Sequence, residues 1–203
     1  MGLFGTSYHQ LTDEQLMELV GRGKSSALNE LYARYSKRLL FYFRRMLNGD
    51  IHKAEDFLHD VFLRVIERPH VFDGARSFST WIFSCAHNAC KNEYRRLQVR
   101  SEHNAPDADY EFDELVQADA DAIERIDGET FRTMLNATLD DVHPDSKTIF
   151  LLRYAEDFTL PEIAEVTGIP LGTVKSRLFY LIRHVAQQLK MFAPNTCNNS
   201  TRT

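Results

Sequence analysis

The chain has 203 residues, of which 43% are hydrophobic and 26% are charged. These values are typical of one globular domain or two small ones, and they exclude a disordered chain. No apolar stretch approaches the roughly 18 residues that a membrane span needs, and the first residues lack the basic start and apolar run of a secretory signal. We therefore expect a cytoplasmic protein with no direct membrane insertion.

The net charge of −5 conceals three segments of different sign. Residues 1–100 carry 15 basic and 11 acidic side chains, residues 101–145 carry 2 and 14, and residues 146–203 carry 7 and 4. Two mildly basic blocks thus flank a strongly acidic segment. Basic blocks of this kind are compatible with nucleic-acid binding, although the averaged charge is not.

The first basic block predicts a helical domain over residues 10–97. Thr12 and Gln15 form a capping box in front of the first apolar residues. Apolar residues at three- and four-residue spacing then continue through residues 28–47, and Asn48-Gly49 ends that run.

The next helix, "AEDFLHDVFLRVIERP" at residues 54–69, has two different faces. Its apolar series faces inward: Ala54, Phe57, Leu58, Val61 and Val65, with Phe62 and Ile66 at the edge. Its outward side chains are Glu55, Asp56, His59, Asp60, Leu63 and Glu67.

Two functions are possible for that outward face, a metal site or a docking face. A metal-dependent hydrolase could use His59 and Asp60 together with Glu55 or Asp56. A hydrolase gains nothing from Leu63 among its ligands, however, whereas a small apolar contact ringed by charge is the common layout of a protein interface. The pattern favours a docking face, and we expect no catalytic residue, no metal and no cofactor. The role of His59 stays open.

A further helix is predicted from about Ser77 to Arg96, and it carries a polar, basic stripe. Its core side is expected to consist of Ile82, Phe83, Ala86, Ala89 and Cys90. The opposite arc consists of Trp81, Ser84, Asn88, Lys91, Asn92 and Arg95. A stacking platform, amides and cations suit unpaired bases. Alternatively, Trp81 packs under the preceding loop, and the arginines of this segment are merely solvated.

The three cysteines form no C-x-x-C pair, and their odd count argues against a disulfide framework. We expect Cys85 and Cys90 to be small buried thiols. Residues 98–128 are acidic and weakly periodic, which predicts a flexible linker. A second helical domain is expected over residues 129–192, followed by a disordered tail at residues 193–203.

The second domain contains a predicted helix-turn-helix, "FTLPEIAEVTGIPLGTVKSRLFYLIRHVAQQL". Thr159 and Glu162 form a capping box, and Gly168 supplies the tight turn. The second helix, from Thr173 onward, has a core side of Val174, Leu178, Leu181 and Val185. Its outward and flanking side chains are Thr173, Lys175, Ser176, Arg177, Phe179, Tyr180 and Arg183. Such side chains can hold phosphates and contact base edges in a major groove, whereas a plain helical hairpin would leave them solvated.

From about residue 12 to residue 190 the chain resembles a bacterial extracytoplasmic-function (ECF) sigma factor of the sigma-70 family. The first domain is similar to sigma region 2 in "ALNELYARYSKRL" and in the stretch from "AEDFLHDVFLRVIERP" to "CKNEYRR". The second is similar to region 4 in "LLRYAEDFTLPEIAEVTGIPLGTVKSRLFYLIRHV". The resemblance implies an all-α fold of two small helical domains joined by an acidic linker, and a non-enzymatic protein that directs promoter-specific transcription initiation.

The resemblance also implies partners and site residues. The helix at residues 54–67 would dock on the β′ clamp helices of core RNA polymerase, and region 4 would meet the β flap. The helix from Trp81 to Arg96 and the loop before it, which includes Arg76, would melt the −10 element, with a flipped base near Asn88.

Region 4 would read the −35 element through Arg153, Lys175, Ser176 and Phe179. The next position is often arginine in the family and is Tyr180 here, which puts recognition at that point in doubt. Promoter DNA and an anti-sigma factor are the further implied partners. A stand-alone helix-turn-helix regulator would explain the second domain equally well, but it leaves Trp81, Asn88 and the basic stripe unexplained.

Overall fold

The computed structural model describes residues 8–101 and 128–191, and within these ranges every regular element is a helix. The elements in chain order are η1 (Tyr8–Gln10), α1 (Asp13–Gly21), α2 (Ser25–Met46), α3 (Ile51–Glu67), η2 (Pro69–Val71), α4 (Phe78–Ser101), α5 (Gly128–Asp140), α6 (Pro144–Tyr154), α7 (Leu160–Thr167) and α8 (Leu171–Met191). The expected all-α class is confirmed. The tail at residues 193–203, residues 102–127 of the expected linker and Cys197 lie outside the described residues.

The amino-terminal unit, α1–α4, begins as the sequence predicts. The Thr12 side chain accepts a hydrogen bond from the Gln15 backbone N–H, and the Gln15 side chain accepts one from the Thr12 backbone N–H. Asp50 caps the start of α3 through the Lys53 backbone N–H. These caps satisfy backbone donors that the first helical turn leaves without partners.

The inward face of α3 is the one that the periodicity predicts. Ala54, Leu58, Val61, Phe62 and Val65 are buried, whereas Phe57 is partly buried. Ile66, predicted at the edge, is 48% exposed. It therefore belongs to the surface of α3.

The carboxy-terminal unit, α5–α8, contains the predicted helix-turn-helix. Thr159 and Glu162 form the capping box of α7, and Gly168 ends that helix with a left-handed φ of 69°. Glycine adopts this conformation without the clash that a Cβ causes. Helix α8 begins at Leu171, two residues before the predicted start. Its four predicted core residues are all buried: Val174, Leu178, Leu181 and Val185.

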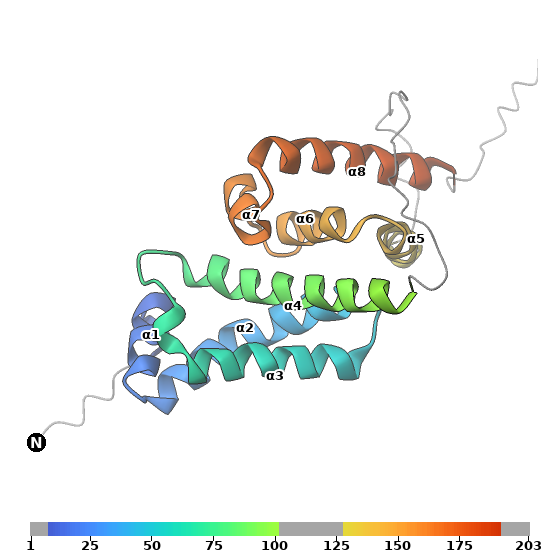
Figure 1. Ribbon diagram of the computed structural model, residues 1–203. Coiled ribbons are helices and arrows are strands. Elements are labelled where there is room, and N and C mark those ends of the chain that lie inside the picture. The colour runs from blue at the N-terminus through green and yellow to red at the C-terminus, as the bar shows by residue number, and fades with distance from the viewer. Residues whose placement is uncertain (1–7, 102–127, 192–203) are drawn as a thin grey trace, which may run out of the picture.

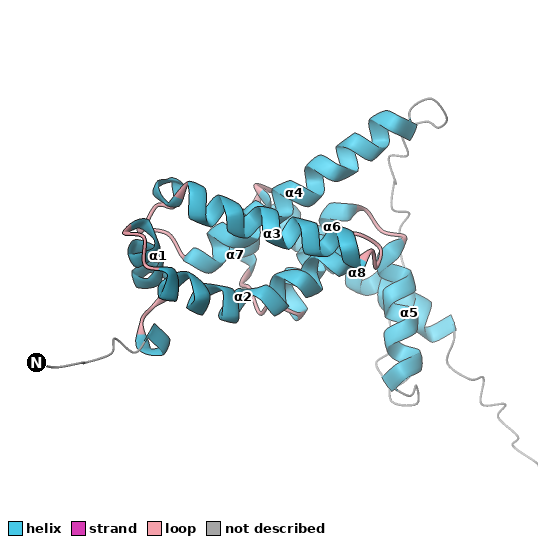
Figure 2. Ribbon diagram, turned by 90° about the horizontal axis from the view of Figure 1, so that it is seen from below, coloured by secondary structure: helices cyan, strands magenta, loops and turns pink. Residues whose placement is uncertain are grey.

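Helix α4 lies between the two units (Figure 1). It packs on α2 and α3 on one side and on α7 on the other, while α6 reaches α2. A single cluster of buried apolar side chains therefore runs from α1 through α4 into α6, α7 and α8. A second, smaller cluster joins α5 to α8. Figure 2 shows the last turns of α4 projecting away from α2 and α3, up to Ser101.

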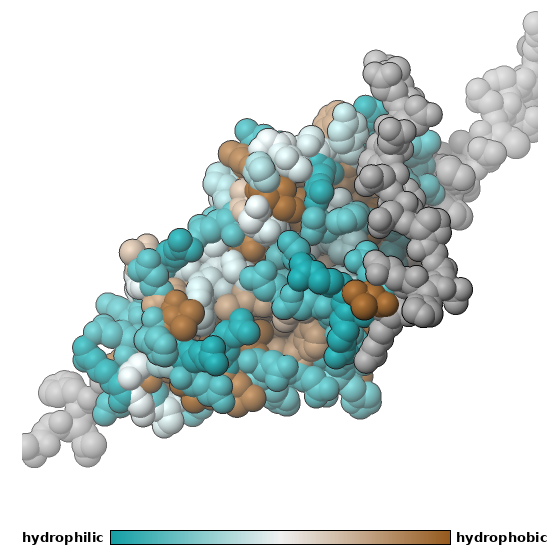
Figure 3. Space-filling model, in the orientation of Figure 1, coloured by the Kyte–Doolittle hydropathy of each residue, from teal (hydrophilic) through white to brown (hydrophobic). Residues whose placement is uncertain are grey.

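The face of the molecule that Figure 3 shows is mixed, with hydrophobic residues in small separate groups among hydrophilic ones. Among the helices of the described ranges, none is both long enough and apolar enough to cross a membrane.

Candidate nucleic-acid interface

The outward face of α3 is exposed to solvent. Its six predicted docking residues are all exposed: Glu55, Asp56, His59, Asp60, Leu63 and Glu67. Leu63 is 50% exposed, and Ile66 lies three residues further along the helix. Tyr32 of α2 is 41% exposed and packs its ring 4.8 Å from that of Phe62. The apolar part of this face is therefore larger than periodicity within one helix predicts.

The same side chains do not form a metal cluster. In residues 8–101 and 128–191, no three His, Cys, Asp or Glu side chains are arranged so that they could hold a metal ion. His59, Asp60, Glu55 and Asp56 project into solvent from one helix. Catalytic metal sites instead take their ligands from several converging elements.

The predicted stripe on α4 is only partly open to solvent. Asn88, Lys91, Asn92 and Arg95 are exposed, whereas Ser84 is partly buried and donates a hydrogen bond from Oγ to the Thr80 carbonyl oxygen at 2.8 Å. Arg76, in the loop before α4, is exposed.

Trp81 is partly buried, and its ring lies 5.4 Å from Phe72 and 5.7 Å from Phe78. It thus packs beneath the preceding loop, which is the second of the two alternatives that the sequence left open. A helical projection could not decide between them, because it leaves out the loop that folds back over the first turn. A stacking role for the remaining exposed part of the ring stays a prediction.

The inner side of α4 is held by apolar and ionic contacts. Cys85 and Cys90 are buried free thiols, as expected, and burial raises the pKa of Cys90 to about 12. Lys53 of α3 donates from Nζ to the buried Glu93 at 2.5 Å, and Arg96 lies 2.9 Å from the same carboxylate. The hydrogen bond from Lys53 lowers the pKa of Glu93. These contacts fix the rotation of α4 and hence the direction of its polar stripe.

The outward face of α8 combines cations, a hydroxyl and two aromatic rings. Lys175, Ser176, Phe179 and Tyr180 are exposed, and Thr173, Arg177 and Arg183 are partly buried. Phe179 is 56% exposed, and the guanidinium of Arg183 lies 5.5 Å from its ring centroid. Apolar rings beside cations can contact thymine methyl groups and phosphates together.

Two arginines of the predicted duplex-reading set are also tied within the protein. Arg153 donates from Nη1 to the Phe158 carbonyl oxygen at 3.0 Å, although its side chain stays exposed. Arg177 donates from Nη1 to Asp145 Oδ2 at 2.6 Å. Arg177 must therefore share its guanidinium between Asp145 and any phosphate.

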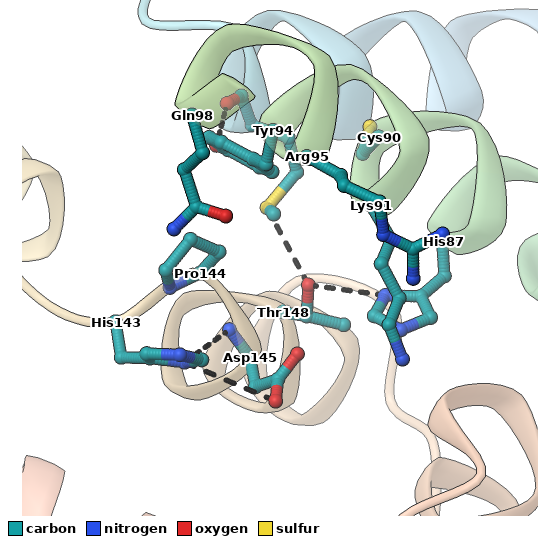
Figure 4. Close-up of a pocket in the computed structure, with 11 residues that line it drawn as sticks. His87, Cys90, Lys91, Tyr94, Arg95, Gln98, His143, Pro144, Asp145 and Thr148 are labelled. Carbon is teal, nitrogen blue, oxygen red and sulfur yellow. Dashed lines mark hydrogen bonds and ion pairs between the residues drawn. The ribbon is translucent and has the colours of Figure 1, made fainter. Parts of the chain in front are cut away.

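Periodicity does not predict the cavity of about 260 Å³ that lies between α4 and the start of α6 (Figure 4). Lys91 and Arg95 line it from α4, and His143 and Asp145 line it from α6 and its N-cap. His87, 3% exposed, also lines it and has its Nδ1 3.5 Å from Thr148 Oγ1. Burial lowers the pKa of His87; Asp145 opposes this shift and Lys91 adds to it.

Family models match both halves of the chain. The family described as "Sigma-70 region 2" matches residues 31–100, and the family described as "Sigma-70, region 4" matches residues 132–180. The two matched ranges cover most of α2–α4 and most of α5–α8.

Curated proteins and solved structures agree with the family models. The chain is 32% identical over 176 residues to the ECF RNA polymerase sigma-E factor of Haemophilus influenzae, covering 84% of this chain and 91% of that protein. It shares its fold with CnrH, solved in complex with the cytosolic domain of CnrY (TM-score 0.64, 19% identity, 89% of this chain and 98% of that chain). It also shares its fold with the sigma factor RpoE of Bartonella quintana, solved in complex with the anti-sigma factor NepR (TM-score 0.58, 20% identity, 80% and 98%).

A stand-alone regulator would account for the region 4 match but not for the region 2 match. Both matches, together with a relative that spans most of the chain, account for the two helical units together. The chain belongs to the ECF group of sigma-70 family RNA polymerase sigma factors, non-enzymatic subunits that direct promoter-specific transcription initiation.

Proposed function

We propose that three helices of this sigma factor each bind a different partner or promoter element. The outward face of α3 docks on core RNA polymerase, α4 holds the unpaired strand of the −10 element, and α8 reads the −35 duplex. The observation that carries this division is the burial pattern: each helix buries its apolar side and leaves the proposed binding residues at least partly accessible.

The docking proposal rests on the composition of the α3 face. Leu63, Ile66 and Tyr32 supply an apolar centre, and Asp60 and Glu67 supply charge near it. Buried apolar anchors give an interface its affinity, while charged rims give it orientation and a faster association rate. We propose the β′ clamp helices as the partner of this face and the β flap as the partner of region 4, because the family resemblance implies them.

The DNA proposal rests on the two different polar faces. On α4, Asn88 and Asn92 can bond base edges, and Lys91 and Arg95 can hold phosphates. On α8, Lys175 and Ser176 can meet a duplex backbone or base edge, with Phe179 against a methyl group. Neither face is strongly basic, so we expect the free protein to bind DNA weakly and to gain affinity when polymerase holds both contacts together.

An anti-sigma factor is a further proposed partner. RpoE of Bartonella quintana was solved with the anti-sigma factor NepR, and CnrH was solved with the cytosolic domain of CnrY. Because this chain shares their fold over most of its length, we propose that an anti-sigma factor binds it as well.

Run-off transcription with core polymerase and a promoter library tests the proposed function. We expect one class of promoter to be transcribed only when this chain is added. Asp60→Arg should weaken binding to core RNA polymerase and so lower transcription from every promoter. Phe179→Ala should lower transcription only from promoters that depend on their −35 element. Asp141→Arg, at an exposed acid after α5, and Phe41→Ala, at an aromatic that is 47% exposed on α2, are the matched controls. If no promoter is transcribed, the proposed function is wrong.

A further inference from the structure

The cavity between α4 and the start of α6 carries basic and polar side chains on its α4 side (Figure 4). Lys91, Arg95 and Gln98 line it from that helix. Its volume of about 260 Å³ lies just below the range of about 300–1,000 Å³ that is typical of sites for drug-sized ligands. A ligand that fills this cavity must therefore be small.

His87 contributes an unpaired polar atom to the wall of this cavity. Its side chain is 3% exposed, and its Nδ1 lies 3.5 Å from Thr148 Oγ1. Within residues 8–101 and 128–191, no group forms a hydrogen bond with the other ring nitrogen, Nε2. Because most buried polar side-chain atoms in folded proteins are hydrogen-bonded, a buried nitrogen in this state points to a bound group that pairs with it.

The charge of the cavity wall favours an anion. Lys91 and Arg95 are exposed cations of α4. Among the described residues that line the cavity, Asp145 is the only acid, and Arg177 donates from Nη1 to its Oδ2 at 2.6 Å. This ion pair offsets the negative charge of Asp145, so the two cations of α4 decide the sign of the ligand.

His143 adds a hydrogen-bond donor on the wall opposite α4. It is the N-cap residue of α6, and its Nδ1 accepts a hydrogen bond from the Asp145 backbone N–H at 3.2 Å. A ring nitrogen that accepts carries no proton, so the neutral ring keeps its proton on Nε2. The two walls therefore offer both cations and neutral donors to a ligand with several acceptor oxygens.

The rest of the wall is apolar. The Tyr94 hydroxyl donates to the Met46 carbonyl oxygen, so the Tyr94 ring, the Met46 side chain and Pro144 supply apolar surface. A ligand that matches this lining joins an anionic group to a small apolar body. A phosphate monoester fits better than a carboxylate, because it carries more charge and more acceptor oxygens for the cations.

We propose that this cavity binds a small phosphate monoester. Lys91 and Arg95 hold its phosphate oxygens, His87 donates to it from Nε2 while Nδ1 accepts from the Thr148 hydroxyl, and its apolar body lies against Tyr94. Such a site gives the sigma factor a small-molecule input that acts directly on its own chain, which goes beyond the proposed contacts with polymerase and promoter DNA.

Titration of the full chain with phenyl phosphate at constant pH tests this proposal, with the ring-nitrogen resonances of histidine followed by NMR. The His87 resonances are identified by their loss in His87→Leu. We expect a saturable shift of the Nε2 resonance and a higher melting temperature, because the ligand binds only the folded chain. Inorganic phosphate, which lacks the ring, should bind more weakly, and phenol, which lacks the phosphate, should give no saturable shift.

Two variants remove the proposed cations while keeping most of the aliphatic side chain. Lys91→Met and Arg95→Met should each raise the Kd for phenyl phosphate by on the order of tenfold, because each loses a charge-assisted hydrogen bond. Arg44→Met is the matched control, since Arg44 is an exposed cation of α2 that does not line the cavity. It removes the same charge and should leave the Kd nearly unchanged.

Three outcomes would overturn the proposal: no saturable shift with phenyl phosphate, equal Kd values in Lys91→Met, Arg95→Met and Arg44→Met, or phenol that binds as tightly as phenyl phosphate. The three substituted cations are exposed, so we expect these variants to fold, and circular dichroism checks this. The titration needs neither polymerase nor promoter DNA. Its failure therefore bears on the cavity alone, whereas loss of promoter-dependent transcription bears on the proposed function.

Discussion

Leu63 offers a sharp test of the docking face, because it is a half-exposed leucine in the middle of charged neighbours. We expect Leu63→Ala to weaken binding to core RNA polymerase while leaving the fold intact. Full burial of a leucine side chain contributes about 1.5–3 kcal/mol. Because 50% of Leu63 is still exposed in the free protein, docking can gain about half of this, or ~1 kcal/mol. That corresponds to roughly a fivefold increase in Kd.

Fluorescence anisotropy of the labelled full chain against core polymerase measures this change. Leu97→Ala is the matched control, since Leu97 is 45% exposed but lies on α4, outside the docking face. Leu58→Ala is the opposite case: Leu58 lies on the inner side of α3, is 4% exposed, and its truncation should cost about 2–5 kcal/mol of unfolding free energy. Equal Kd values for Leu63→Ala and Leu97→Ala would refute the assignment of this face.

Three further changes have predicted outcomes. Gly168→Ala should cost about 1 kcal/mol of unfolding free energy in urea melts, because the residue has a φ of 69° while no atom lies within 4 Å of the added Cβ; a neutral result would contradict the strain argument. Thr159→Ala should lower the free energy of unfolding by about 1 kcal/mol in the same urea melts, since it removes the cap of α7; Thr159→Ser should keep most of this stability. Burial lowers the pKa of His87, so the folded protein resists its protonation and should lose stability as pH falls below about 6.5. In urea melts, the free energy of unfolding should fall less between pH 7.5 and pH 5.5 in His87→Leu than in the parent protein. Equal falls would exclude His87 as the cause.

The placement of His87 illustrates what sequence periodicity leaves out. A helical wheel assigns α4 one apolar side, and Ile82, Phe83 and Ala86 are indeed buried. His87 and Thr80 are buried as well, at 3% and 2% exposure. The carboxy-terminal unit covers a second side of the helix: α7 packs on α4, and Thr148 of α6 lies 3.5 Å from His87 Nδ1. No local pattern marks that second side, since the residues that cover it come from more than 60 positions further along the chain.

The helices, their caps and their inward faces follow from the sequence alone. Spacing of three and four residues places one stripe of side chains against the neighbouring helix, and the capping box at Thr12 and the glycine at position 168 act within a single turn. Interactions of such short range depend on neighbouring residues only, so the outward faces of α3 and α8 could also be identified from the spacing of residues in the sequence.

The tertiary structure alone decided how the two units meet. Arg38 and Glu156 are a charged pair with no sequence signature, and Phe83 could have packed on α2 or α3 alone. The free energy of such contacts comes from burying apolar surface and from neutralising a buried charge, and both depend on which surfaces face each other. The sequence therefore determines which side chains each helix presents, whereas the packing of the two units decides which of those side chains are buried between them.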